Sequence, residues 1–221
     1  MPHINNLFLN TLRKLAVVSA LSISSLVSFS VHALFIPVGP QNDIDIATVT
    51  NVWGWTLCDT SFYSQGNAGG IASLDASCQN NDYIMLAGRE TGNNILDVLA
   101  ATSVLDATTD TGAANNGITT TSNGAEWYYN PNHSWGFAGL GDSVNKAQCD
   151  TNGLNERDRL CWHTLNFNVG GWRSGNHTGL NGSNSFEKLV FVANYVPEPG
   201  SLAVFSLAMV GLGFSRRKTR K

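Results

Sequence analysis

The sequence lacks the short motifs that mark the common catalytic sites. It contains no nucleophile elbow of the G-x-S-x-G type, no H-E-x-x-H helix, no phosphate-binding P-loop and no dinucleotide fingerprint. Two carboxylates such as Glu126 and Asp142 could serve a glycosidase, but a sequence does not show how far apart they lie. The sequence therefore predicts no catalytic residue and a protein that is not an enzyme.

The chain also lacks a long uninterrupted apolar run. Residues 15–27 are apolar but diluted by serines, and residues 201–214 would reach only about 21 Å as a helix, at about 1.5 Å per residue. The hydrocarbon core of a bilayer is about 30 Å thick, so neither stretch suits a comfortable permanent span. Each stretch lies near an end of the chain and has the features of a targeting segment instead.

At the first end, residues 1–33 predict a secretory signal peptide that signal peptidase removes. Arg13 and Lys14 close a basic region, residues 15–27 form the apolar segment, and Val31 and Ala33 supply small residues before the cleavage site. An uncleaved N-terminal anchor is the alternative, which the serines and the ending of the segment disfavour.

At the other end, three parts follow one another: Pro197, Glu198 and Pro199, then an apolar helix over 201–214, then a basic cluster. The cluster consists of Arg216, Arg217, Lys218, Arg220 and Lys221. Basic residues beside a membrane segment stay in the cytoplasm, which leaves everything before Pro197 outside and agrees with a signal peptide. A buried core helix is the alternative, and the basic end argues against it.

This order of parts resembles the PEP-CTERM sorting signal of Gram-negative bacteria, over residues 196–221. In that family a membrane protease-transpeptidase, exosortase, recognises the tail and releases or transfers the protein. The resemblance implies transient anchoring in the inner membrane, processing by an exosortase-type enzyme, and a final place at the cell surface or in the extracellular matrix.

Removing both ends leaves residues 34–196, enough for one exported domain with its own core. This part holds six basic and fifteen acidic residues, so its net charge is near −9 rather than the −3 of the whole chain. An acidic domain repels nucleic acid and anionic lipid, and neither is an expected partner. Neutral glycans and divalent cations are the more natural ligands.

Four cysteines, Cys58, Cys78, Cys149 and Cys161, all lie in this domain. An even count in an oxidising compartment predicts disulfides. Pairing of neighbours in the sequence, Cys58 with Cys78 and Cys149 with Cys161, is favoured among the three possible connectivities. A zinc site is the alternative, but the two-residue cysteine spacing that such a site prefers is absent.

The domain reads as all-β, a single disulfide-stapled sandwich or jelly roll. Candidate strands are rich in β-branched and aromatic residues and are separated by turns dense in Asn and Gly. They cover 44–57, 83–87, 126–129, 134–137, 162–167 and 186–195. Residues 95–105 fit either one helix or two strands, and the sequence leaves that choice open.

The middle of the chain also resembles a group of exported bacterial domains without an established activity. The segments that carry this resemblance are 126–129, 134–137, 149–151, 159–164, 170–175, 180–183 and 186–188. Relatives in that group often carry an extra cysteine pair where this chain has Gly88 and Ser174. The resemblance therefore implies that these two positions lie close together.

Carbohydrate-binding surfaces stack aromatic rings on sugars and use Asn, Asp and Arg for the hydroxyl groups. The possible glycan-binding residues are Trp127, Tyr129, Trp172, Arg173 and Asn176. The alternative is that the tryptophans only form the core of a small β domain. Trp172, which is set among glycines and polar residues, is the one most expected to be exposed.

A calcium site is a weaker candidate, and no other cofactor is expected. Hard cations take several oxygen ligands, and a closed acidic loop can supply them. The candidate ligands inside the expected disulfide loop are Asp150, Asn152, Glu156 and Asp158. Leu154 breaks the EF-hand pattern, so a solvated acidic loop is the alternative.

These observations predict an exported surface or matrix protein that is sorted by its tail, does not catalyse a reaction and binds extracellular polysaccharide. A small secreted hydrolase acting on envelope or extracellular polysaccharide is one alternative. A purely structural matrix component is the other.

Overall fold

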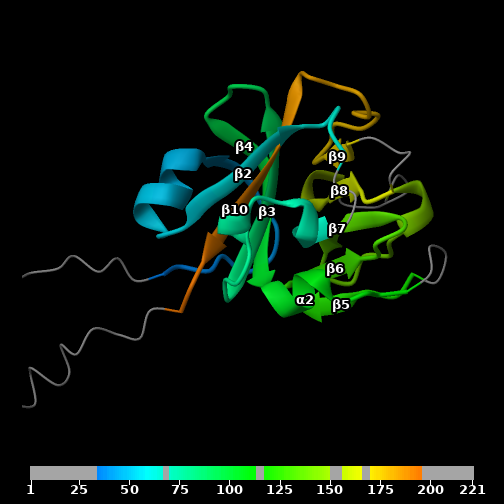
Figure 1. The fold of residues 1–221 in the computed structure, drawn as a ribbon, viewed down its shortest axis with the longest axis horizontal. Coiled ribbons are helices and arrows are strands. Elements are labelled where there is room, and N and C mark those ends of the chain that lie inside the picture. The colour runs from blue at the N-terminus through cyan, green and yellow to red at the C-terminus, as the bar shows by residue number, and fades with distance from the viewer. Residues whose placement is uncertain (1–33, 67–69, 113–116, 150–155, 166–169, 196–221) are drawn as a thin grey trace, which may run out of the picture. The chain divides into compact units, whose positions relative to one another are not determined.

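The structure is a computed structural model that describes residues 34–66, 70–112, 117–149, 156–165 and 170–195 (Figure 1). Two antiparallel sheets of five strands each dominate it, so the expected all-β class is confirmed. The predicted signal peptide and sorting tail lie outside the described residues.

The first sheet has the strand order β1-β4-β3-β10-β2. Its strands are β1 (Gln41–Asp45), β2 (Thr56–Phe62), β3 (Tyr83–Glu90), β4 (Ile95–Ser103) and β10 (Phe186–Ala193). The last strand in the sequence is thus a central one, paired on one side with β3 and on the other with β2. The chain therefore leaves the domain from an interior strand that is hydrogen-bonded on both sides.

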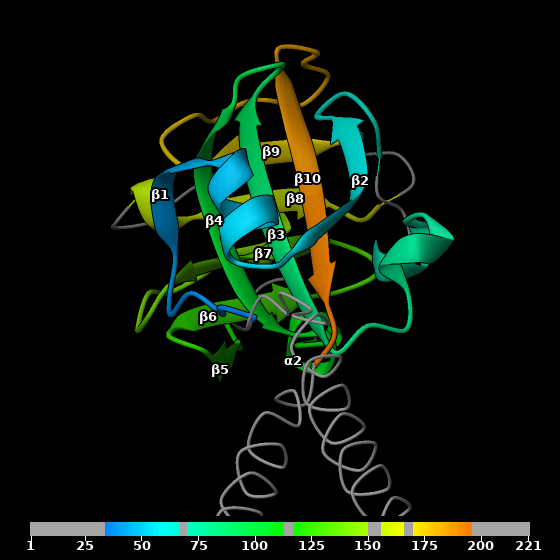
Figure 2. The ribbon, with the colours of Figure 1, turned by 90° about the vertical axis from the view of Figure 1, so that its left-hand side faces the viewer.

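The second sheet follows the sequence order β5-β6-β7-β8-β9. Its strands are β5 (Thr120–Ser122), β6 (Ala125–Tyr129), β7 (Ser134–Gly139), β8 (Leu160–His163) and β9 (Gly171–Ser174). Short helical segments connect the strands: η1 (Thr48–Val52), η2 (Gly70–Ser73), η3 (Ala76–Cys78), α2 (Val104–Thr108), η4 (Lys146–Gln148) and η5 (Glu156–Asp158). In Figure 2 the strands of this sheet run across those of the first sheet, behind them.

The two sheets enclose the main hydrophobic core. Side chains on alternate positions of β3, β4 and β10 meet three tryptophans of the second sheet, Trp127, Trp135 and Trp162. Trp135 and Trp162 pack edge to face, with ring centroids 5.8 Å apart. All three tryptophans are completely buried, so the stacking surface of their rings stabilises the fold and is closed to any ligand.

The opposite face of the first sheet is covered as well. Here η1 and the segment from residue 34 pack Val49 and Trp55 against the remaining positions of β3, β4 and β10. Strands buried on both faces read as continuous apolar runs without alternation. This accounts for the apolar run at 83–87, and Leu189, Phe191 and Ala193 share this second face.

Two predictions of local structure need correction or completion. The strand expected over 44–57 is wrong, because the chain turns into η1 after Asp45 and returns to a strand only at Thr56. Gly54, with a φ of 78°, makes the turn between the two. The undecided segment 95–105 is one strand followed by α2, whose first turn is capped by Ser103: its Oγ accepts a hydrogen bond from the backbone N–H of Asp106 at 3.0 Å.

Both expected disulfides are present. Cys58 is bonded to Cys78, and Cys149 to Cys161, with Cα atoms 5.3 Å and 5.5 Å apart. The first bridge ties the edge strand β2 to η3, and the second ties the loop before η5 to β8 on the outer face of the second sheet. In the unfolded chain each closed loop would lose conformational entropy, which stabilises the fold by about 3 kcal/mol per bridge.

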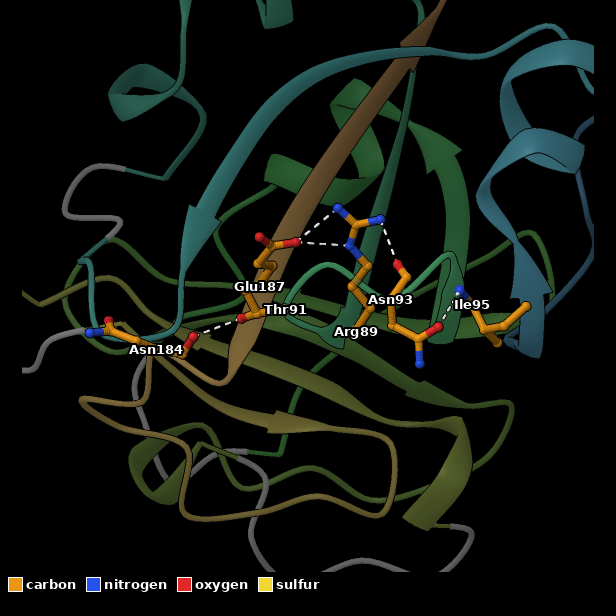
Figure 3. A network of polar contacts seen from close by, with 6 residues as sticks. All are labelled: Arg89, Thr91, Asn93, Ile95, Asn184 and Glu187. Carbon is orange, nitrogen blue, oxygen red and sulfur yellow. Dashed lines mark hydrogen bonds and ion pairs between the residues drawn. The ribbon is translucent and has the colours of Figure 1, made fainter.

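A polar network closes one end of the first sheet, where β3 turns into β4 (Figure 3). Arg89 donates through Nε and Nη2 to the same carboxylate oxygen of Glu187, at 2.9 Å and 2.8 Å. Its Nη1 donates to the carbonyl oxygen of Asn93, whose side-chain oxygen accepts from the N–H of Ile95. Charge-assisted bonds of this kind fix the turn to β10.

Candidate functional site

A polar pocket lies where β1, β4, η5 and the segment after β9 meet. It is lined by Asn42, Asp43, Asp97, Arg157, Gly175, Asn176 and His177. Four distant parts of the sequence thus supply side-chain amides, carboxylates, a guanidinium and an imidazole to one hollow. Of the residues that the sequence singled out for binding, only Asn176 lies in it.

The side chain of Asn42 is held at this pocket by a hydrogen bond from its amide nitrogen. Its Nδ2 donates to Oδ1 of Asp158 at 2.7 Å, while its own Oδ1 is buried and accepts no hydrogen bond within the described part of the chain. A buried acceptor without a donor loses the solvation it had in water, typically at a cost of about 1–3 kcal/mol.

Asp97 projects from β4 into the same pocket. Ser174 Oγ donates to Asp97 Oδ2 at 3.0 Å. Burial raises the pKa of Asp97 above its ordinary value, against the opposing effects of the Ser174 hydrogen bond and of the nearby His177. At the rim, the exposed Arg157 guanidinium pairs with the exposed carboxylate of Asp43.

The pocket therefore offers donors and acceptors side by side. Such a set matches the hydroxyl groups of a sugar, each of which donates and accepts at once. Within the described ranges, no group of three or more His, Cys, Asp or Glu residues is arranged to hold a metal ion.

The aromatic candidates lie elsewhere. Trp127 is completely buried in the core between the sheets, so its prediction as a glycan contact is wrong. Tyr129 is half-buried and packs edge to face on Trp135, with centroids 5.9 Å apart. Its ring also fills the space where a side chain at Gly70 would stand.

Trp172 and Arg173 lie on β9, the edge strand of the second sheet. Trp172 is half-buried beside His163, with ring centroids 6.5 Å apart, and its buried Nε1–H has no acceptor in the described residues. Arg173 is buried, and its guanidinium faces the carboxylate of Glu156 at 3.7 Å. Trp172 is therefore the aromatic candidate with a ring face partly open to a ligand, and Arg173 has a structural partner.

The carboxylate pair considered for a hydrolase is engaged in structural bonds. Both Thr119 and Thr121 donate to Glu126 Oε2, at 2.6 Å and 2.9 Å, and the N–H of Gly141 donates to Oε1. Burial raises the pKa of Glu126, but these hydrogen bonds outweigh it and the pKa is lowered. Asp142 pairs with Arg159 at 3.2 Å. Glu126 is therefore not poised as a general acid, which would need a raised pKa.

Two of the four calcium candidates, Asp150 and Asn152, lie outside the described residues. The other two have partners of their own. Glu156 faces Arg173, and Asp158 accepts a hydrogen bond from Asn42. The two described calcium candidates, Glu156 and Asp158, therefore connect η5 to neighbouring residues.

In the comparison with protein families, residues 196–218 match the PEP-CTERM protein-sorting motif. The chain carries a PEP-CTERM sorting signal. No curated protein and no solved structure matches the chain significantly. The match covers the Pro-Glu-Pro motif, the apolar run and the first basic residues of the tail.

The PEP-CTERM signal determines where the protein goes. It is an exosortase substrate that is exported to the cell surface or the extracellular space and is anchored in the membrane only transiently. The motif, with Pro197, Glu198 and Pro199, lies outside the described residues. Within the described ranges, no helix is long and apolar enough to cross a membrane.

Sequence analysis did not find the pocket, although one signal was available. Asp97 stands as a lone carboxylate in the otherwise apolar stretch 95–101. A charge in a strand that is covered on both faces needs a polar neighbour, and the structure supplies Ser174 and His177. These partners come from the end of β9 and from the segment after it, and no sequence spacing connects them with Asp97.

Proposed function

We propose that the exported domain, residues 34–196, is a non-catalytic module that binds extracellular polysaccharide through the pocket between Asn42, Asp97 and Asn176. Signal peptidase would remove residues 1–33, and exosortase would process the tail. The domain would then be delivered to the surface or the matrix as a glycan-binding component.

The observation that carries this proposal is the pocket itself, which gathers the polar side chains of Asn42, Asp43, Asp97, Asn176 and His177 from separate parts of the chain. Sugar hydroxyls placed there would donate to the amide oxygen of the exposed Asn176 and accept from its Nδ2. The net negative charge of the domain also favours a neutral ligand over an anionic one.

A non-catalytic role is supported by the engagement of Glu126 and Asp142 in structural bonds. A hydrolase needs one carboxylic acid that stays protonated and a second carboxylate on the opposite side of the bond to be cleaved. The hydrolase alternative would have to use other carboxylates.

Binding of the purified full chain to a glycan array tests the proposal. Asn176→Ala removes one ligand contact from an exposed position and should weaken binding about tenfold, the worth of one hydrogen bond of about 1.4 kcal/mol. Asn51→Ala, on the exposed side of η1, is the matched control and should leave binding unchanged.

Three outcomes would overturn the proposal. Absence of binding to every glycan, with and without calcium, would favour a purely structural role. Loss of binding in Trp172→Ala but not in Asn176→Ala would move the site to the edge strand β9. Shortening of a polysaccharide during incubation would establish the hydrolase.

A further inference from the structure

Four large apolar side chains are exposed at the end of the sandwich where β10 leads into the sorting tail. Phe35 is 51 % exposed, Val38 71 %, Leu105 76 % and Tyr195 65 %. In Figures 1 and 2 the described chain begins and ends side by side at this end. We call this group of four residues the apolar end.

Hydrogen bonds to Asp82 hold Tyr195 close to α2, which carries Leu105, although the two lie far apart in the sequence. Asp82 accepts at Oδ2 from the N–H of Tyr195 at 2.8 Å, and its carbonyl oxygen accepts from the N–H of Val104 at 3.0 Å. The tail-proximal Tyr195 and α2, which carries Leu105, therefore flank the same residue.

The N-terminal members are attached to the same region. Asn123 donates through Nδ2 to the carbonyl oxygens of Pro37 and of Ala101, near the end of β4, at 2.7 Å and 2.8 Å. The ring of Phe35 lies 5.2 Å from that of Trp53, which packs on the cluster containing Ala193. The position of the apolar end is thus fixed by the last residues of β4 and β10.

The other end of the first sheet is different in character. There the ion pair of Arg89 with Glu187, together with Asn93, Thr91 and Asn184, forms the polar network of Figure 3. The nine residues of β4 separate the two ends, and the eight steps between its first and last residue span about 26 Å at 3.3 Å per residue. The apolar side chains exposed at that end, Ile95 and Phe62, are only 36 % and 38 % exposed, so the more exposed apolar residues lie at the tail end of the strands.

The length of the connecting chain places the apolar end close to the bilayer during anchoring. Six residues lead from Tyr195 to Ser201, where the apolar run of the PEP-CTERM motif begins. Even fully extended they span only about 20 Å, which is less than the length of β4. Because β10 is a central strand, this tether starts from a fixed point of the fold.

We propose that the apolar end rests on the membrane surface while the sorting tail anchors the precursor. Tyrosine and tryptophan favour the interface between headgroups and hydrocarbon, and single exposed Leu and Val side chains gain from shallow insertion there. Asp82 and Asp106 lie beside the group, so the matching surface is zwitterionic rather than anionic lipid. Such contact fixes the orientation in which the tail and its cleavage site are presented to the processing enzyme.

The test uses the full chain, with its tail intact, in nanodiscs of phosphatidylcholine. A photoreactive benzophenone amino acid replaces Leu105 in one sample and Ile95 in another. Ile95 is an exposed apolar residue at the opposite end of β4 and serves as the matched control. After irradiation, mass spectrometry measures the fraction of chains that carry a lipid adduct.

The proposal predicts a several-fold higher lipid yield at position 105 than at position 95. In a third sample the photoreactive residue replaces Tyr195, and adding Leu105→Asp should lower its lipid yield several-fold. Equal yields at 105 and 95, or no effect of Leu105→Asp, would overturn the proposal. In discs made from host membrane, a protein adduct at position 105 in place of lipid would also overturn it.

Discussion

Replacing Lys188 with methionine is expected to stabilise the protein at neutral pH and to remove part of its pH dependence. Lys188 lies on the face of β10 that looks into the core between the sheets, and its side chain is fully buried. Its Nζ donates to the carbonyl oxygen of Gln65 and lies 6.0 Å from the centroid of the Trp162 ring. Burial lowers the pKa of Lys188 from 10.5 to about 7, while the charge of Asp59 opposes the shift.

The magnitude follows from the difference in pKa between the folded and unfolded states. Below about pH 7 Lys188 is charged in both states, and a difference of about 3.5 in pKa corresponds to a penalty of order 5 kcal/mol on the folded state. Between about pH 7 and 10.5 the folded state holds the amine neutral while the unfolded state keeps it protonated. Unfolding then takes up a proton, so each added pH unit stabilises the folded state by about 1.4 kcal/mol.

Methionine has nearly the shape of lysine and does not titrate. Its cost is the loss of the donor to Gln65, about 1–3 kcal/mol. Because this cost is smaller than the penalty of the buried charge, Lys188→Met should be more stable than the wild type at pH 6.5. By pH 9.5 the wild type should have gained about 3 kcal/mol relative to the variant.

Urea unfolding followed by tryptophan fluorescence at pH 6.5 and 9.5 measures the two free energies of unfolding. Groups other than Lys188 titrate in both proteins, so their contributions cancel in the difference between wild type and variant. Equal m-values would show that the comparison concerns the same transition. A difference that stays constant within about 0.5 kcal/mol across this range would refute the reasoning.

Two further predictions concern other buried sites. Lys146→Met should cost about 1–3 kcal/mol of stability, because the ammonium group donates to the carbonyl oxygens of Thr111 and Ile118 at 2.8 Å and 3.0 Å. A free energy of unfolding in urea that is unchanged in the variant would contradict this. Gly88→Cys with Ser174→Cys should form a third disulfide, because a Cβ at Gly88 would lie 2.9 Å from that of Ser174, within about 1 Å of the usual separation in a disulfide. Mass spectrometry should show the loss of two hydrogens, and two alkylated thiols in the untreated double variant would contradict the prediction.

The ends of the chain could be interpreted from the sequence because their signals are local. A proline-rich motif, a short apolar run and a basic end occur in order within residues 197–221, and the PEP-CTERM match confirms that interpretation. The disulfide pairing could also be predicted from the sequence, since cysteines that are close in sequence pair most readily. The closeness of Gly88 to Ser174, which the resemblance implied, is confirmed, since a Cβ at Gly88 would lie 2.9 Å from that of Ser174.

The parts that sequence analysis missed depend on contacts between distant segments. Residues 44–57 have a strand-like composition, but η1 forms there because Val49 is needed to cover the outer face of the first sheet. The edge strands β5 and β9 are too short and too polar to show alternation. The pocket joins Asn42, Asp97 and Asn176 from three segments, and only the folded chain brings them together.

The measurement that tests the central claim most directly is the mass of the mature protein recovered from its host. If the tail is a sorting signal that exosortase recognises and processes, the mature C-terminus should lie near Pro197–Pro199, and residues 201–221 should be missing. Mature protein that still ends in the basic cluster at Lys221 would contradict processing and would indicate a plain membrane anchor.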